Sequence, residues 1–503
     1  MIGWCADFGR LLLGLFYWNL RKSWYRFRRG RCSCPCQAQS DSGRAYETQC
    51  EACVQWNRPA RFRRVCPLLV ETPQGLRCSA DAADVRSFWR RAAAYYGGGV
   101  LTLYLVGVIA IFAFLRTIGY PVSIFHVGLP PLWHRLGEAR GWFFLNKSNL
   151  AFEQDRISEG LLYLTNAYEF DPTSYAAGLS LAKHLQAGQP ARSDEICLRV
   201  LREHPAKSHS TAQDWFRALL ARGSFERIAT LARDELLAGS SQSPVWIRAL
   251  VFAARRLPSD RILQELSTHP SPTVQRWRPI FEVELLLRAG RNAGARAAIE
   301  AHWPDNSPGF SLFDRVNALT ERRDAFAALD LLGRYPSLLD AEAVITLRLD
   351  ALAVGGMQRP LLQEVERLLA APLTPTSLPV VKILCAHLIR YPSASVFERL
   401  TQKISRETIP LHTESAGVWF SLFCTAGAVG DRAKLHELTA QLKHASKRPF
   451  MALGAVEAFF RGETAERRIT SFLPVLPLPL EVTYAMLARY LPPPATVLPA
   501  TPL

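Results

Sequence analysis

The longest unbroken run of apolar residues lies at residues 92–115, which read AAAYYGGGVLTLYLVGVIAIFAFL. The run contains no charge and no proline. At 1.5 Å per residue it is long enough to cross the hydrocarbon core of a bilayer, which is about 30 Å thick. Trp89 and Tyr120 flank the run, where interfacial aromatic residues are common. We therefore predict a transmembrane helix over residues 92–118. A buried core helix is the alternative and would need neighbours on every face.

A second pattern begins at residue 142, where apolar residues recur at helical spacing up to residue 490. Amphipathic segments alternate with glycine or polar turns, as in FRALLARGSFERIATLARDELL (216–237). The pattern predicts a mainly α protein built from helical hairpins. The proline-broken stretch 119–141 is expected to be a linker, and the proline-rich end at 491–503 is expected to be a disordered or polyproline tail.

One hairpin carries a recognisable set of packing positions. The segment FLNKSNLAFEQDRISEGLLYLTNAYEFDP ends at Pro172, and its small and apolar positions are Phe144, Ser148, Ala151, Gly160, Leu164 and Ala167. This segment resembles a tetratricopeptide repeat, in which small residues let the two helices approach and a proline ends the unit. Lys147 departs from the family pattern, which has a large apolar residue there. A second unit aligns loosely, with Ser193 and Val200 at packing positions and Pro205 at its end.

The resemblance implies an α-solenoid of about nine or ten TPR-like hairpins over residues 142–490. A compact α-bundle is the structural alternative. Tetratricopeptide arrays bind peptides or other proteins, and polar or aromatic residues on the first helix of a repeat line their groove. By that resemblance the candidate partner-binding residues are Asn146, Asn149 and Phe152. A solvated helix face explains the same three residues equally well.

The charge of the chain is concentrated near its start. Residues 1–91 hold 16 basic and 7 acidic side chains, and residues 1–31 combine arginines with aromatic residues in an amphipathic, basic segment. The positive-inside rule places this end in the cytoplasm and the solenoid in the periplasm. We expect a single-pass protein of the inner membrane of a Gram-negative-type bacterium. Arginine outnumbers lysine 51 to 9 along the whole chain, which indicates codon bias and not nucleic-acid binding.

Cysteine is concentrated in the same part of the chain, with eight of eleven residues before position 80. A reducing cytoplasm disfavours disulfides, and thiolates at short spacing suit tetrahedral zinc. We predict a small zinc-ribbon-like module over residues 32–91 with structural zinc. Iron–sulfur chemistry, S-acylation and disulfides with inverted topology remain open. The candidate metal ligands are Cys34, Cys36, Cys50, Cys53, Cys66 and Cys78. Cys197, Cys385 and Cys424 are isolated in helical patterns and are expected to be core residues.

Motifs of catalysis are missing from the sequence. It contains no G-x-x-x-x-G-K-[ST] phosphate loop, no G-x-S-x-G elbow and no H-E-x-x-H pair. We therefore expect a non-catalytic membrane scaffold or adaptor that binds protein partners through its solenoid. The alternatives are a transmembrane sensor that couples the solenoid to the zinc module, and a redox or metal enzyme that uses the cysteine cluster.

Overall fold

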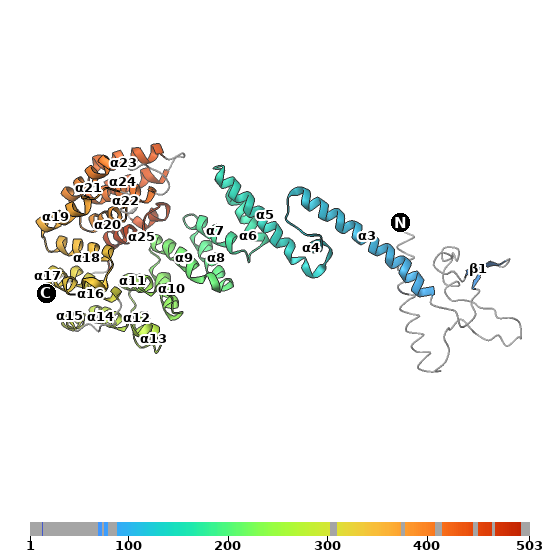
Figure 1. Ribbon diagram of the computed structural model, residues 1–503, viewed down its shortest axis with the longest axis horizontal. Coiled ribbons are helices and arrows are strands. Elements are labelled where there is room, and N and C mark those ends of the chain that lie inside the picture. The colour runs from blue at the N-terminus through green and yellow to red at the C-terminus, as the bar shows by residue number, and fades with distance from the viewer. Residues whose placement is uncertain are drawn as a thin grey trace. The chain divides into compact units, whose positions relative to one another are not determined.

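The computed structural model is mainly helical and divides into two compact units, Met1–Asp171 and Pro172–Leu503 (Figure 1). The structure describes residues 13, 69–72, 75–78, 88–301, 309–373, 378–407, 415–445, 451–464 and 468–493. Within these ranges the only strands are β1 (Leu69–Thr72) and β2 (Gly75–Cys78). They form an antiparallel hairpin in which Leu69 lies opposite Cys78 and Thr72 opposite Gly75.

Helix α3 (Phe88–Ile118) contains the apolar run and begins before it. Its Gly97–Ile118 part is long and apolar enough to cross a membrane. Large apolar side chains such as Leu103 and Phe114 are exposed on it, as they are not in a core helix. The helix ends at Ile118, because the next residue, Gly119, has a φ of 99°, which a right-handed helix does not allow. The structure thus has, among its described residues, a helix of sufficient length and apolarity where the sequence predicted a transmembrane helix.

The stretch predicted as a linker is largely helical. It contains α4 (Ile124–Gly128), the 3₁₀ turn η2 (Pro130–Leu132) and the start of α5 (His134–Glu153). Ser123 caps α4 by accepting a hydrogen bond from the backbone N–H of His126. The prolines of η2 supply no N–H, so they end α4 without preventing a new helix from starting directly after them.

Helices α5 and α6 (Ile157–Phe170) form a close hairpin. The Ser148 hydroxyl donates a 2.8 Å hydrogen bond to the carbonyl of Gly160. A Cβ at Gly160 would lie 2.6 Å from the Phe152 ring, so only glycine fits there. Ser148 and Gly160 are buried, as are three other predicted packing positions, Ala151, Leu164 and Ala167. Phe144 is half-buried and stacks on Phe170 with ring centroids 5.4 Å apart.

In the second unit most helices pack against their neighbours in the sequence. The helices are α7 (Tyr175–Leu185), α8 (Pro190–Glu203), α9 (Ser208–Arg222), α10 (Phe225–Leu237), α11 (Ser243–Ala254), α12 (Arg261–Ser267), α13 (Pro272–Gln275), α14 (Arg278–Arg288), α15 (Asn292–Glu300), α16 (Gly309–Glu321), α17 (Ala325–Arg334), α18 (Ala341–Val354), α19 (Gln358–Leu369), α20 (Leu378–Arg390), α21 (Ala394–Glu407), α22 (Ala416–Val429), α23 (Arg432–Ala445), α24 (Met451–Arg461) and α25 (Leu480–Tyr490). Short 3₁₀ turns are η3 (Pro205–Lys207), η4 (Pro336–Leu338), η5 (Ile469–Ser471) and η6 (Leu473–Val475).

The last helix departs from this order. Helix α25 packs against α20 and α9, both far from it in the sequence, and Figure 1 shows it beside α20. Arg489 in its last turn donates to the carbonyls of Ile389 (3.1 Å) and Ala428 (2.9 Å) at the ends of α20 and α22. The second unit therefore differs from a simple array in which each hairpin touches only the adjacent ones.

The three isolated cysteines lie in the core of the second unit. Cys197, Cys385 and Cys424 are buried and free, which confirms the expectation for them. Burial raises the pKa of Cys197 and of Cys385 to about 12. These thiols are therefore protonated at neutral pH and act as small apolar groups.

Candidate functional site

The predicted metal ligands lie almost entirely outside the described residues. Five of the six lie outside the described residues: Cys34, Cys36, Cys50, Cys53 and Cys66. Only the backbone of Cys78 is described, at the end of β2. In the described part of the chain, no three His, Cys, Asp or Glu side chains gather as a metal site would require. The zinc module therefore stays a prediction.

The predicted partner-binding residues lie on α5, three residues apart along one helix face. Asn146 and Asn149 are exposed. The Phe152 ring is half-buried and lies over Gly160 of α6, so it holds the hairpin together. The structure thus leaves two of the three side chains accessible to a partner.

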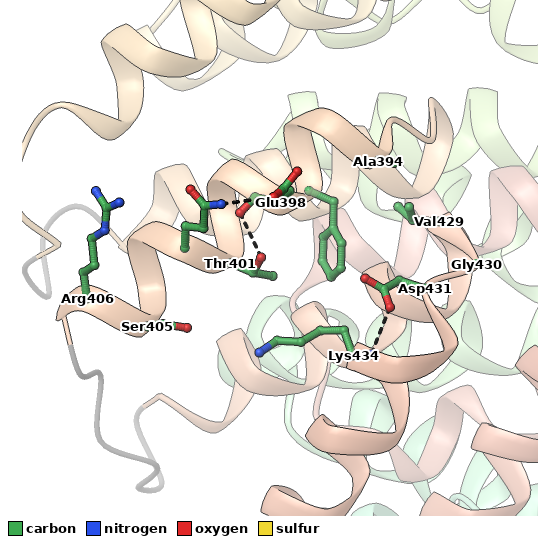
Figure 2. A pocket seen from close by; sticks show the side chains of 11 residues that line it. Ala394, Glu398, Thr401, Ser405, Arg406, Val429, Gly430, Asp431 and Lys434 are labelled. Carbon is green, nitrogen blue, oxygen red and sulfur yellow. Dashed lines mark hydrogen bonds between the residues drawn. The ribbon is translucent and has the colours of Figure 1, made fainter.

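The second unit has a polar groove between α21 and the turn from α22 to α23, with a volume of about 670 Å³ (Figure 2). Its polar groups bond mostly within their own helices. Gln402 donates to the Glu398 carboxylate at 3.1 Å, and the Lys434 backbone N–H donates to Asp431 at 2.9 Å. These polar groups therefore have hydrogen-bond partners in the absence of a ligand.

A second hollow, which we call the central cleft, has a different character. It has a volume of about 330 Å³ and lies where α11, α16, α18, α20 and α25 meet. Each helix contributes lining residues through a face that carries aromatic or charged side chains. Among these residues are Arg248, Phe252, Arg255, Phe313, Asp314, Glu321, Glu342, Arg390, Glu481 and Tyr484.

A buried ion-pair network lies at one side of the cleft. The Arg255 guanidinium, 8% exposed, donates from Nε to Glu284 at 3.0 Å and from Nη1 to Glu321 at 2.6 Å. Burial disfavours the charge of Arg255, but Glu284 and Glu321 outweigh it and hold the pKa of Arg255 well above its usual value. The network ties α11 to α14 and α16 next to the cleft.

Asp314 lies in the same buried environment, where the nearby positive charge does not compensate for its own negative charge. Burial raises the pKa of Asp314 to about 7, and the nearby negative charge of Glu284 adds to the effect. Arg255 opposes the shift but does not cancel it. A carboxyl group with this pKa exchanges its proton near neutral pH.

Aromatic side chains form another wall of the cleft. Tyr484 and Phe252 meet edge to face with ring centroids 4.7 Å apart, and the Arg248 guanidinium lies 4.5 Å from the Tyr484 ring centroid. Tyr484 is 5% exposed, and its hydroxyl has no hydrogen-bond partner among the described residues. Burial raises the pKa of Tyr484, so the group is a neutral hydroxyl that can donate or accept.

The exposed charge at the mouth of the cleft is acidic. Glu342 and Glu481 are exposed, and neither forms an ion pair within the part of the chain that the structure describes. Of the three lining arginines, Arg255 is bound by the network, Arg390 pairs with Asp350, and Arg248 lies on the face of the Tyr484 ring. A cationic group entering the cleft would therefore meet the two exposed carboxylates, with the Arg248 guanidinium as the lining cation outside an ion pair among the described residues.

The sequence interpretation missed these residues. Glu284 and Asp314 stand among apolar residues in FEVELLLR and FSLFDRVNAL, at positions that become buried in α14 and α16. A charge on the apolar side of a helix is a signal of a buried pair. That signal could have marked both residues, but not their partners on other helices.

No protein-family model matches the chain, and no curated protein matches it significantly.

Proposed function

We propose that the chain is a non-catalytic, membrane-anchored scaffold or adaptor whose second unit binds a peptide segment of a partner protein. The central cleft is the binding site in this proposal. The observation that carries it is Tyr484, a residue that lines the cleft and whose buried hydroxyl has no partner among the described residues. A buried hydroxyl without a hydrogen bond costs about 1–3 kcal/mol, which a bound polar group would recover.

The charges at the mouth suggest the class of peptide. Glu342 and Glu481 attract a lysine or arginine side chain, and the rings of Tyr484 and Phe252 offer an apolar surface for its stem. The backbone amides and carbonyls of such a peptide could bond to Tyr484. We therefore expect selectivity for segments that combine a basic residue with an apolar neighbour.

The membrane anchor in this proposal is α3, with residues 1–91 in the cytoplasm of a bacterium and residues 119–503 in the periplasm. The apolar length of α3 and the basic residues before it support this arrangement. A TPR-like solenoid is the architecture we propose for the hairpins. The buried small residues of α5 and α6 and the packing of consecutive helices support it.

The cysteine-rich segment is proposed to bind structural zinc through a subset of Cys34, Cys36, Cys50, Cys53, Cys66 and Cys78. Metal analysis of the purified full-length chain tests this point. Stoichiometric zinc is the expected result, and a coloured iron-containing protein would contradict it.

Peptide binding is tested with the full-length protein in nanodiscs. The probe is an array of octapeptides in which one position is lysine, alanine or glutamate and the neighbouring positions are apolar. We expect the lysine series to bind best, and Glu342→Lys to weaken it by about tenfold, as expected for losing a close charge pair. Tyr484→Phe removes only the hydroxyl and should weaken binding severalfold.

The matched control is Glu398→Lys, the same charge reversal on the exposed face of α21 at the groove of Figure 2. It should leave binding of the lysine series unchanged. Equal losses in Glu342→Lys and Glu398→Lys would show a general charge effect and contradict a site in the central cleft.

A further inference from the structure

The chain turns back along α3 directly after that helix ends. It reverses at Gly119, and α4 then lies against the side of α3. The Tyr104 hydroxyl donates a hydrogen bond to the Gly128 carbonyl. Val108 is covered at the same place, because a Cβ on Gly128 would lie 3.2 Å from its Cγ1 atom. Helix α4 is therefore held beside α3 instead of extending away from it, and η2 packs against α4.

The length of α3 sets the depth of this segment. Its 31 residues span about 46 Å at 1.5 Å each, which exceeds a hydrocarbon core of about 30 Å. The predicted span, residues 92–118, is longer than one crossing needs. A crossing that starts at Ala92, directly after Arg91, leaves the hydrocarbon core about 20 residues later, near Ile111, and so keeps the charge of Arg116 outside the core. Gly128 lies level with Val108, so α4 and η2 reach the boundary between acyl chains and headgroups.

The side chains of the segment suit that boundary. Phe125, Leu129 and Trp133 are 64%, 47% and 53% exposed. The sequence holds no Asp, Glu, Lys or Arg between Arg116 and Arg135. Such a patch is unfavourable in water, but here it continues the exposed apolar surface of α3.

Several polar groups of the segment are also hydrogen-bonded within the segment itself. The N–H groups of Leu129 and Trp133 donate to the carbonyls of Phe125 (3.0 Å) and Pro130 (3.2 Å). The Trp133 indole donates to the Val127 carbonyl at 3.0 Å. Internal bonds of this kind lower the cost of leaving water.

We propose that residues 121–133 form a membrane wedge that inserts Phe125, Leu129 and Trp133 into the phospholipid leaflet on the carboxyl-terminal side of α3. The inference rests on the proposed membrane anchor. The exposed Arg135, at the start of α5, follows the wedge and is placed to meet lipid phosphates. The wedge would fix the height of the hairpin α5–α6 above the bilayer.

Photo-crosslinking tests the wedge in the full-length protein in phospholipid nanodiscs. The variants Phe125→p-benzoylphenylalanine and Leu129→p-benzoylphenylalanine place a photoreactive group at exposed positions. The same replacement at Leu103 reports the span, and at Phe326, 78% exposed in the second unit, it reports background. We expect severalfold more lipid adducts at 125 and 129 than at position 326, because inserted side chains are surrounded by acyl chains.

Lipid adducts at 103 with only background at 125 and 129 would overturn the wedge and leave the membrane anchor intact. Background at 103 as well would overturn the anchor, and the wedge with it.

Discussion

Asp314 carries a carboxyl group where its charge is poorly stabilised. The residue is 6% exposed, and burial raises its pKa to about 7, with Glu284 adding to the shift. In the unfolded chain the same carboxyl group ionises near pH 4. Between these two values the folded protein binds more protons than the unfolded one, so the free energy of unfolding falls as the pH rises from about 4 to about 7.

Asp314→Asn should remove this pH dependence, because the amide stays neutral. We expect the variant to gain thermal stability relative to the wild type as the pH rises from 5 to 8. The gain should be roughly 5 °C, which corresponds to about 2 kcal/mol in a large domain. Circular dichroism melting of both proteins in nanodiscs at several pH values measures it. A difference in melting temperature that does not change with pH would contradict the buried-carboxyl argument.

Replacing Arg255 alone should lower the free energy of unfolding more than replacing Arg255 and Glu284 together. Arg255→Met leaves Glu284, 1% exposed, as a buried charge without its cation, and we expect a loss of about 3–5 kcal/mol. The double variant Arg255→Met with Glu284→Met removes both charges and should recover most of that loss. Denaturant unfolding of the two variants provides the comparison. Additive losses in the double variant would show that the pair is not coupled.

At the level of elements, buried carboxylates recur as links between helices. Asp194 of α8 accepts from Trp215 of α9 at 2.7 Å and from Arg222 of α9 at 2.6 Å. Asp350 of α18 lies 2.8 Å from Nδ1 of His387 on α20. The Arg255 and Glu284 pair links α11 to α14 in the same way. Each pair fixes the register of two helices that apolar contacts alone would let slide.

The return of α25 depends on Arg489 as well as on apolar packing. Its two hydrogen bonds to the ends of α20 and α22 involve a charged donor, so each contributes about 1.5–3 kcal/mol. Arg489→Leu should therefore lower the free energy of unfolding by about 3 kcal/mol. Arg432→Leu, at an exposed position of α23, is the matched control and should cost little. Equal effects of the two substitutions on chemical unfolding would refute this role of Arg489.

Local pattern predicts local structure in this chain, and the exceptions have physical reasons. The apolar run predicted α3, and the small residues at 148, 151 and 160 predicted the contact face of α5 and α6. Helix α4 was missed because prolines in 119–141 indicate a break and do not exclude a short helix between them. The return of α25 and the central cleft join segments far apart in the sequence. Periodicity within one helix says which face is apolar, but not which distant helix covers it.

At the scale of the whole molecule, the distribution of charge and of cysteine makes the proposed topology testable. Residues 1–91 hold the excess of basic side chains and eight of the eleven cysteines. The other three, Cys197, Cys385 and Cys424, are buried in the second unit, and burial raises the pKa of each. A thiol reagent applied to the native protein therefore reports almost entirely on the amino-terminal segment.

A membrane-impermeant maleimide should accordingly leave the wild-type protein unlabelled in intact cells. Phe326→Cys adds a thiol at a position that is 78% exposed, and this variant should label rapidly if the second unit is periplasmic. Permeabilising the cells should then expose the amino-terminal cysteines, and a chelator should increase their labelling if zinc holds them. The inverse result, with amino-terminal labelling in intact cells and none at position 326, would reverse the topology. It would also place the cysteines in an oxidising compartment, where disulfides become the expected chemistry.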